Sequence, residues 1–263
     1  MANNELKVAI IPYDIVWADK DENLMSVSHL LRNVDADTDI VVLPEMFTTG
    51  FITDNTMVST LAETNTGKTI DAVHRWADFF KFAICGSFIA STASGFYNRA
   101  FFIEPSGDET FYDKKHLFSI GGESKVYNQG DKVSPIVRFR GWNIKFVVCY
   151  DVRFPMWCRN IDNNYDVMIA TANWPASRSY AWNQLLIARA IENQSYVVGA
   201  NRSGKDDYGT YSESDSVIID YKGKQIGERD ARGIIYAQMS QEKLLAFRTK
   251  FPVWKDADRF QLI

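Results

Sequence analysis

The sequence predicts an α/β fold in which helices cover sheets. Short apolar segments rich in β-branched residues alternate along the chain with stretches whose apolar residues recur at helical spacing. The 263 residues are 46% hydrophobic and 14% aromatic, which is enough to bury a large core near the upper size of one domain. We therefore expect one domain over residues 1–263, with functional side chains at the strand ends.

The first half of the chain shows this alternation with clear boundaries. The expected elements, in order, are a strand over 8–11, a helical face of Leu24, Val27, Leu31 and Val34, a strand over 40–43, a helical face of Ile70, Val73, Ala77 and Phe80, a strand over 82–89, and a hairpin over 97–103 and 109–112.

The second half continues the pattern after a strand that ends at Cys149. It predicts a strand over 166–171, a helix over 180–193, and strands over 196–200 and 216–219. The apolar stripe of that helix consists of Trp182, Leu185, Leu186 and Ala190. Spacing alone leaves the strand order open.

Composition narrows the function. The net charge is −4 and no basic run is longer than Lys114-Lys115, so we expect a small-molecule substrate and no nucleic acid. Three cysteines without a Cys-x-x-Cys and three scattered histidines predict no disulfide, metal or cofactor, and fit the reducing cytoplasm. Neither a signal peptide nor an apolar stretch of membrane-spanning length is apparent, so no membrane association is expected.

Three strand ends carry residues suited to nucleophilic catalysis. Cys149 ends the apolar run 146–148, Glu45 follows the run 40–43 and a proline, and Lys114 follows the expected strand 109–112. A helix N-terminus or a cation near Cys149 would lower its pKa, a desolvated glutamate is a general base, and a lysine stabilises an oxyanion. Taken singly, a buried structural cysteine and solvated charges are the simpler interpretations.

Read together, three motifs resemble the nitrilase superfamily of carbon-nitrogen hydrolases, in its order and separations. They are Pro44-Glu45, Tyr112-x-Lys114-x-His116-Leu117-Phe118 and Cys149-Tyr150-Asp151-x-Arg153-Phe154-Pro155. Asn173-Trp174-Pro175, Ala188-Arg189-Ala190-x-Glu192-Asn193-Gln194 and Asn201-Arg202 look like later landmarks of the family. The resemblance implies a four-layer αββα sandwich and a homodimer.

The resemblance also implies roles for the site residues. Cys149 would attack an amide carbonyl, Glu45 would move the proton, and Lys114 with the N–H of Tyr150 would hold the oxyanion. Glu123 stands where similar enzymes carry a second glutamate, for which Lys114 is the expected partner; a surface glutamate is the alternative. Tyr112 and Asp151 are expected to support the backbone, and Arg153 to lie behind the residues that touch substrate. A Cys-His pair with His116 is the competing mechanism.

The substrate is harder to predict. Asn173-Trp174-Pro175-Ala176-x-Arg178-Ser179 and the C-terminal run 250–258 look like a bacterial branch whose members are ω-amidases acting on 2-oxoglutaramate and 2-oxosuccinamate. Arg178 would bind the remote carboxylate and Trp174 would form a wall, with Arg202 as the second candidate and a solvated arginine as the alternative.

Other interpretations stay open at this stage. The chain could hydrolyse a nitrile, an N-carbamoyl compound or another amide, or it could be a non-catalytic interaction protein on the same scaffold. The tail over 251–263 packs either on a partner subunit, as the resemblance implies, or against its own domain.

Overall fold

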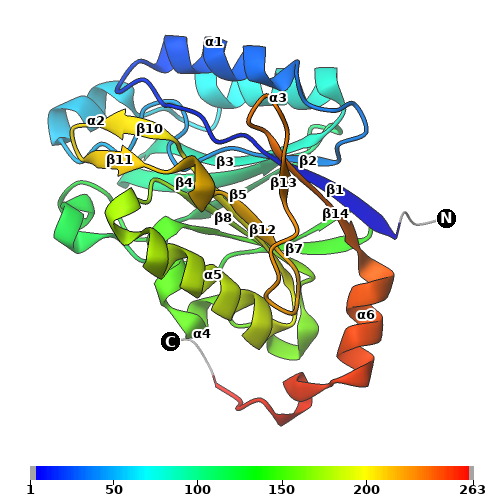
Figure 1. Ribbon diagram of the computed structural model, residues 1–263. Helices are drawn as coiled ribbons and strands as arrows, with labels where there is room; N and C mark the ends of the chain where they lie inside the picture. Colours follow the sequence, from blue (N-terminus) through cyan, green and yellow to red (C-terminus); the bar gives the residue numbers. More distant parts are fainter. Residues whose placement is uncertain (1–3, 261–263) are drawn as a thin grey trace.

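Two β-sheets lie face to face in the protein and carry helices on their outer sides (Figure 1). The computed structural model describes residues 4–260. The larger sheet has seven strands in the order β13-β14-β1-β2-β3-β4-β5. Its strands are β1 (Glu5–Ile10), β2 (Ile40–Val42), β3 (Ala83–Thr92), β4 (Gly95–Ile103), β5 (Glu109–Asp113), β13 (Glu228–Arg229) and β14 (Ile235–Ser240).

The smaller sheet has five strands in the order β12-β9-β8-β7-β6. They are β6 (Ile136–Phe139), β7 (Trp142–Val148), β8 (Val167–Ala172), β9 (Tyr196–Asn201) and β12 (Val217–Ile219). A separate hairpin pairs β10 (Gly204–Asp206) with β11 (Gly209–Tyr211). The three middle strands are parallel in both sheets: β1, β2 and β3 in the larger sheet, and β7, β8 and β9 in the smaller one. Within each sheet, the carboxyl ends of these strands therefore lie at the same edge.

Helices form the two outer layers. α1 (Lys20–Leu31) and α3 (Lys68–Phe80) cover the larger sheet, and α5 (Ser179–Asn193) covers the smaller one (Figure 1). The sandwich is therefore αββα, as the resemblance implied. Three further helices, α2 (Asn55–Leu61), α4 (Pro155–Cys158) and α6 (Gln241–Lys250), were not among the predicted elements, nor were β6 and β14.

Side chains alternate along the strands, so each sheet packs against the other sheet on one face and against helices on the other. In β1, Val8 and Ile10 pack between the sheets, whereas Ala9 packs with α1 and α3. This follows from the period of two in a strand, which sends successive side chains to opposite faces. The predicted helical face extended to Val34, but α1 ends at Leu31, and Val34 packs against the same core from the following turn.

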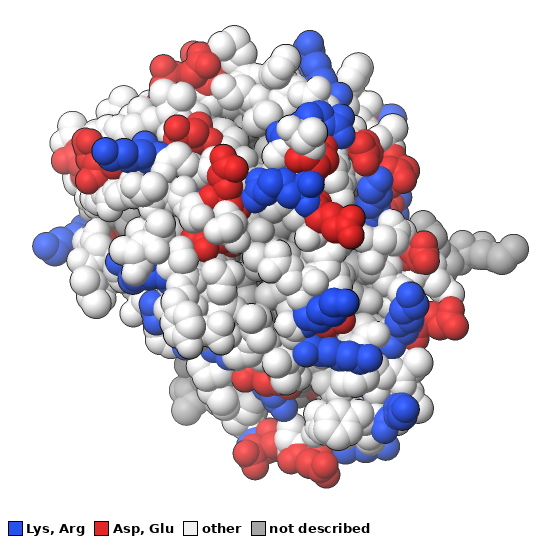
Figure 2. Space-filling model, in the orientation of Figure 1, with Lys and Arg blue, Asp and Glu red and all other residues white. Residues whose placement is uncertain are grey.

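The surface carries charges of both signs. On the face shown in Figure 2, lysines and arginines are interspersed with aspartates and glutamates. No helix within residues 4–260 is both long enough and apolar enough to span a bilayer.

Candidate active site

Four strand ends converge on one cavity of about 700 Å³. Glu45 follows β2 by three residues, Lys114 follows β5 directly, Cys149 follows β7 directly, and Asn173 follows β8 directly. All four residues line the cavity. The two sheets thus bring together side chains that lie up to 128 positions apart in the sequence.

Lys114 lies between two carboxylates. Its Nζ is 2.9 Å from Oε1 of Glu45 and 2.9 Å from both carboxylate oxygens of Glu123, and all three side chains are inaccessible to solvent. Burial alone would lower the pKa of Lys114, but the Glu123 and Glu45 charges outweigh it and raise that pKa, so the lysine is an ammonium. Burial, partly offset by Lys114, raises the pKa of Glu123.

Asn98 is a member of this network that the sequence analysis missed. Its Nδ2 donates to Glu45 Oε1 at 2.7 Å and to Glu123 Oε1 at 3.1 Å, and its Oδ1 accepts from the Ser87 hydroxyl at 3.0 Å. The only signal in the sequence was a polar residue within the apolar run of β4. The other oxygen of Glu45 accepts the backbone N–H of Asn173 at 2.8 Å. These donors hold the Glu45 carboxylate in one orientation.

Cys149 begins a 3₁₀-helix, η3 (Cys149–Arg153), and has a left-handed backbone with φ of 44°. Tyr150 is the second residue of this helix, so its N–H has no partner within the helix and is available as an oxyanion donor. The predicted pKa shift was wrong. Burial and the Glu45 charge raise the pKa of the Cys149 thiol well above its usual value, and Lys114 only partly opposes them. The Cys149 side chain is therefore a thiol at rest, and an attack by its sulfur would need a base.

His116 does not face this network. Its Nδ1 lies 2.8 Å from Oδ1 of Asp151, its ring stacks on Phe154 with centroids 3.7 Å apart, and it is not among the residues that line the cavity. This geometry disfavours the Cys-His alternative, because Nδ1 of His116 is already paired with Asp151 and His116 does not line the cavity that contains Cys149.

The comparisons with known proteins agree with this geometry. A family model for carbon-nitrogen hydrolases matches residues 7–249. The chain belongs to the carbon-nitrogen hydrolase family. It is 42% identical over 263 residues to omega-amidase YafV of Escherichia coli (strain K12), covering 98% of both chains, and 28% identical to the 2-oxoglutaramate amidase of Bacillus subtilis (strain 168), covering 95% of this chain and 96% of the relative.

A solved structure extends the similarity to three dimensions. XC1258 from Xanthomonas campestris, described as a CN-hydrolase superfamily protein with an arsenic adduct in its active site, is 34% identical and superposes with a TM-score of 0.92 over 98% of this chain and 99% of its own. The protein is accordingly a hydrolase of carbon-nitrogen bonds in amides, on a nitrilase-type fold.

Two arginines of this carbon-nitrogen hydrolase line the cavity. Arg153 was predicted to lie behind the substrate-contacting residues, but it is half-buried in the cavity wall, with its guanidinium 4.8 Å from the centre of the Trp174 ring. Arg178 is exposed and lies 5.2 Å from the centre of the Phe118 ring. Neither forms an ion pair with any residue between 4 and 260.

Arg202 is a different case. Its guanidinium is inaccessible to solvent and pairs with Asp14 at 3.0 Å and Asp206 at 2.6 Å. It is absent from the residues that line the cavity. The structure therefore removes Arg202 as a candidate for binding a substrate carboxylate, because its donors are already used within the protein.

The remaining cavity walls are mainly aromatic. Trp174, predicted as a wall, is buried and donates from Nε1 to the Arg178 carbonyl at 2.9 Å. The other aromatic lining residues are Phe51, Phe118, Tyr150, Tyr208 and Tyr211. Such walls suit the aliphatic chain of a substrate, while the few polar groups orient its ends.

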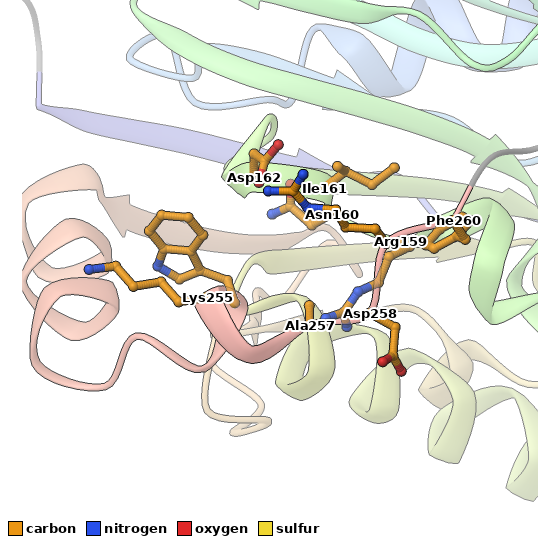
Figure 3. Close-up of a pocket in the computed structure, with 10 residues that line it drawn as sticks. Arg159, Asn160, Ile161, Asp162, Lys255, Ala257, Asp258 and Phe260 are labelled. Atoms are coloured by element: carbon orange, nitrogen blue, oxygen red, sulfur yellow. The ribbon is translucent and has the colours of Figure 1, made fainter.

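A second cavity, of about 460 Å³, lies between Arg159–Asp162 and the C-terminal segment (Figure 3). The described part of the predicted tail, residues 251–260, includes no buried residue; residues 261–263 lie outside the described chain. None of Glu45, Lys114 and Cys149 contributes to this cavity, so it is separate from the catalytic one.

Proposed function

We propose that the protein is an ω-amidase that hydrolyses the ω-amide of short 2-oxo dicarboxylic acids such as 2-oxoglutaramate and 2-oxosuccinamate. The observation that carries the proposal is Arg153, a half-buried cation in the same cavity as Cys149 with no carboxylate partner among residues 4–260. A half-buried guanidinium is best satisfied by an anion, and a planar carboxylate can accept two hydrogen bonds from it. Arg178 supplies a second positive charge nearer to solvent.

The charges along the cavity wall favour a 2-oxo acid over an amino acid. The cationic lining residues are Lys114, Arg153 and Arg178, and Glu45 is the one carboxylate among the described lining residues. Glu45 is already held by Lys114 and Asn98. A substrate ammonium group would meet repulsion and no partner, whereas a 2-oxo carboxylate would meet attraction.

The first chemical step is acylation of Cys149. Glu45 accepts the thiol proton as Sγ attacks the amide carbon, and the oxyanion forms between Lys114 Nζ and the N–H of Tyr150. Because the pKa of the thiol is raised, deprotonation is coupled to attack. Glu45 then returns the proton to the leaving nitrogen, ammonia departs, and a thioester remains on Cys149.

The second step releases the acid. Glu45 deprotonates a water molecule, whose oxygen attacks the thioester carbon, and the oxyanion forms again at the same donors. Collapse of this intermediate breaks the carbon–sulfur bond and returns the proton to the sulfur. Glu123 keeps Lys114 in place through both steps, because both of its carboxylate oxygens contact the ammonium and it does not itself line the cavity.

The names of the relatives support the substrate class. The Escherichia coli relative is an omega-amidase and the Bacillus subtilis relative is a 2-oxoglutaramate amidase. The test is ammonia release from 2-oxoglutaramate, 2-oxosuccinamate, glutamine, propionamide and propionitrile, with Cys149→Ala as the blank. Preferential turnover of the two oxo-amides supports the proposal; preference for propionamide or the nitrile would replace it with another activity of the same family.

We also propose a homodimer. α4, the segment after it, and α5 each carry exposed apolar side chains, with exposures between 44% and 80%, namely Met156, Ile161, Tyr180 and Ile191. Apolar side chains of this size stabilise a subunit interface when they are covered. Light scattering coupled to gel filtration tests this, and a monomer at micromolar concentration would contradict it.

A further inference from the structure

Asp151 lies two residues after the nucleophile, is fully buried, and does not line the cavity. Its carboxylate accepts four hydrogen bonds. Oδ1 accepts the backbone N–H of His116 at 2.9 Å and lies 2.8 Å from His116 Nδ1; Oδ2 accepts the hydroxyl of Tyr112 at 2.8 Å and the backbone N–H of Val148 at 3.1 Å.

These donors come from two separate parts of the chain. Tyr112 and His116 stand on either side of Lys114, where β5 ends, whereas Val148 directly precedes Cys149. One carboxylate therefore joins the segment that carries the oxyanion-binding lysine to the turn that carries the nucleophile. Each connection is a hydrogen bond to a charged acceptor in a dry environment, where such bonds are strong.

The donors are themselves held in place. The Tyr112 hydroxyl accepts Nε1–H of Trp157 at 2.8 Å and the N–H of Lys115 at 3.1 Å. The His116 ring stacks on Phe154. The network has little freedom to shift without breaking a buried hydrogen bond.

The hydrogen bond from the backbone N–H of Val148 to Asp151 also spans Cys149, whose backbone is strained. Cys149 holds a left-handed φ of 44°, which a residue with a Cβ rarely adopts, and the contact between Val148 N–H and Asp151 Oδ2 closes a ring around it. The N–H of Tyr150 lies inside this ring, at the start of the helix.

We propose that Asp151 is a positioning residue that sets kcat by fixing Cys149 and the Tyr150 N–H relative to Lys114. The inference rests on the proposed function insofar as Cys149 is the nucleophile. It concerns the geometry of attack and of the oxyanion site, so it predicts an effect on chemistry and little effect on substrate binding.

The test is Asp151→Asn, which keeps the size of the side chain but turns an NH₂ group toward half of the donors. We expect kcat to fall about 100-fold with KM nearly unchanged, as for a misplacement of the reacting groups. Tyr112→Phe removes one of the four donors to Asp151, together with the acceptor of Trp157 Nε1–H and Lys115 N–H, and is expected to lower kcat about 10-fold. Because both changes break the same network, the double variant should lose much less than the product of the two effects.

The matched control is Asp166→Asn. Asp166 is also buried and accepts hydrogen bonds from the backbone N–H of Asn143 and from the Arg248 guanidinium. It directly precedes β8 and does not line the cavity. It should lower thermal stability without lowering kcat. If Asp151→Asn does not fold, the kcat of Tyr112→Phe alone tests the proposal. A kcat near that of the wild type in the Asp151 or Tyr112 variant, or an equal loss in the control, overturns the proposal.

All variants are assayed with the amide that the wild type hydrolyses fastest, so the result does not depend on the substrate named above. Activity in Cys149→Ala would refute the proposed chemistry itself. An inactive Cys149→Ala beside a fully active Asp151→Asn would refute only the positioning role.

Discussion

The ammonium of Lys114 lies 2.9 Å from the Glu45 carboxylate, and neither side chain is accessible to solvent. A buried ion pair of this kind adds little net stability, because its desolvation cost offsets much of its attraction. We therefore attribute the pair to function rather than to stability. In the proposed mechanism Glu45 acts as the base and the positive charge of Lys114 stabilises the oxyanion.

Cys149→Ala should abolish amide hydrolysis, with kcat reduced on the order of 10⁴-fold or more, because the acyl acceptor is lost. Thermal unfolding should be little changed, since only one atom is removed. Cys158→Ala is the matched control, because Cys158 is a buried free cysteine outside the cavity. Residual wild-type activity in the Cys149 variant would exclude a thioester.

Glu45→Gln and Glu123→Gln should differ although both carboxylates contact Lys114. Glu45 lines the cavity and carries the proton transfers of the proposed mechanism, so its loss should lower kcat about 10³-fold, within the range for general-base catalysis. In the proposed mechanism Glu123 only orients Lys114, so its loss should lower kcat about 10-fold. Steady-state ammonia release separates the two roles; equal losses would show that Glu45 is no base.

The Glu45→Gln variant should also form the Cys149 thiolate at lower pH than the wild type. In the wild type, burial and the Glu45 charge raise the thiol pKa while Lys114 lowers it. Removing the carboxylate charge leaves the lysine unopposed by Glu45, so the pKa falls. The ultraviolet absorbance of the thiolate, measured against Cys149→Ser in the same background, follows the titration. A shift toward higher pH would contradict this electrostatic account.

Arg153→Met should lower kcat/KM for 2-oxoglutaramate about 10- to 100-fold, the range for one charge-assisted hydrogen-bonding group. Propionamide, which carries no carboxylate, should be hydrolysed at an unchanged rate. Arg178→Met should have a smaller effect, because solvent screens an exposed charge. The assignment fails if both substrates lose activity equally.

Arg202→Met should act on stability. It leaves the Asp206 side chain, which is 2% exposed, without its 2.6 Å partner. Breaking a buried pair in this way typically costs about 3–5 kcal/mol of unfolding free energy. Urea denaturation measures the loss. Selective loss of oxo-amide turnover without destabilisation would instead restore Arg202 as a carboxylate ligand.

Sequence reasoning predicted Glu45, Lys114 and Cys149 as site residues because three motifs at strand ends, read together, resemble one family, and the structure brings all three to one cavity. It did not reach Asn98, which lies inside a strand and bonds to Glu45 across 53 positions. It also placed Arg153 behind the site, because the direction of a side chain after a turn depends on backbone geometry that residue types do not reveal.

The sequence by itself determined the alternation of strands and helices, the family, and the residue types available for chemistry, since these depend on neighbours within a few positions. Only the tertiary structure decided the direction of the pKa shift of Cys149 and showed that Arg202 is paired, whereas Arg153 and Arg178 have no ion-pair partner among residues 4–260. Cys149 stands at the start of a helical turn, which locally favours a thiolate, yet burial and a carboxylate from another sheet reverse the shift. Coulomb and desolvation energies depend on distances in space, and the fold sets those distances.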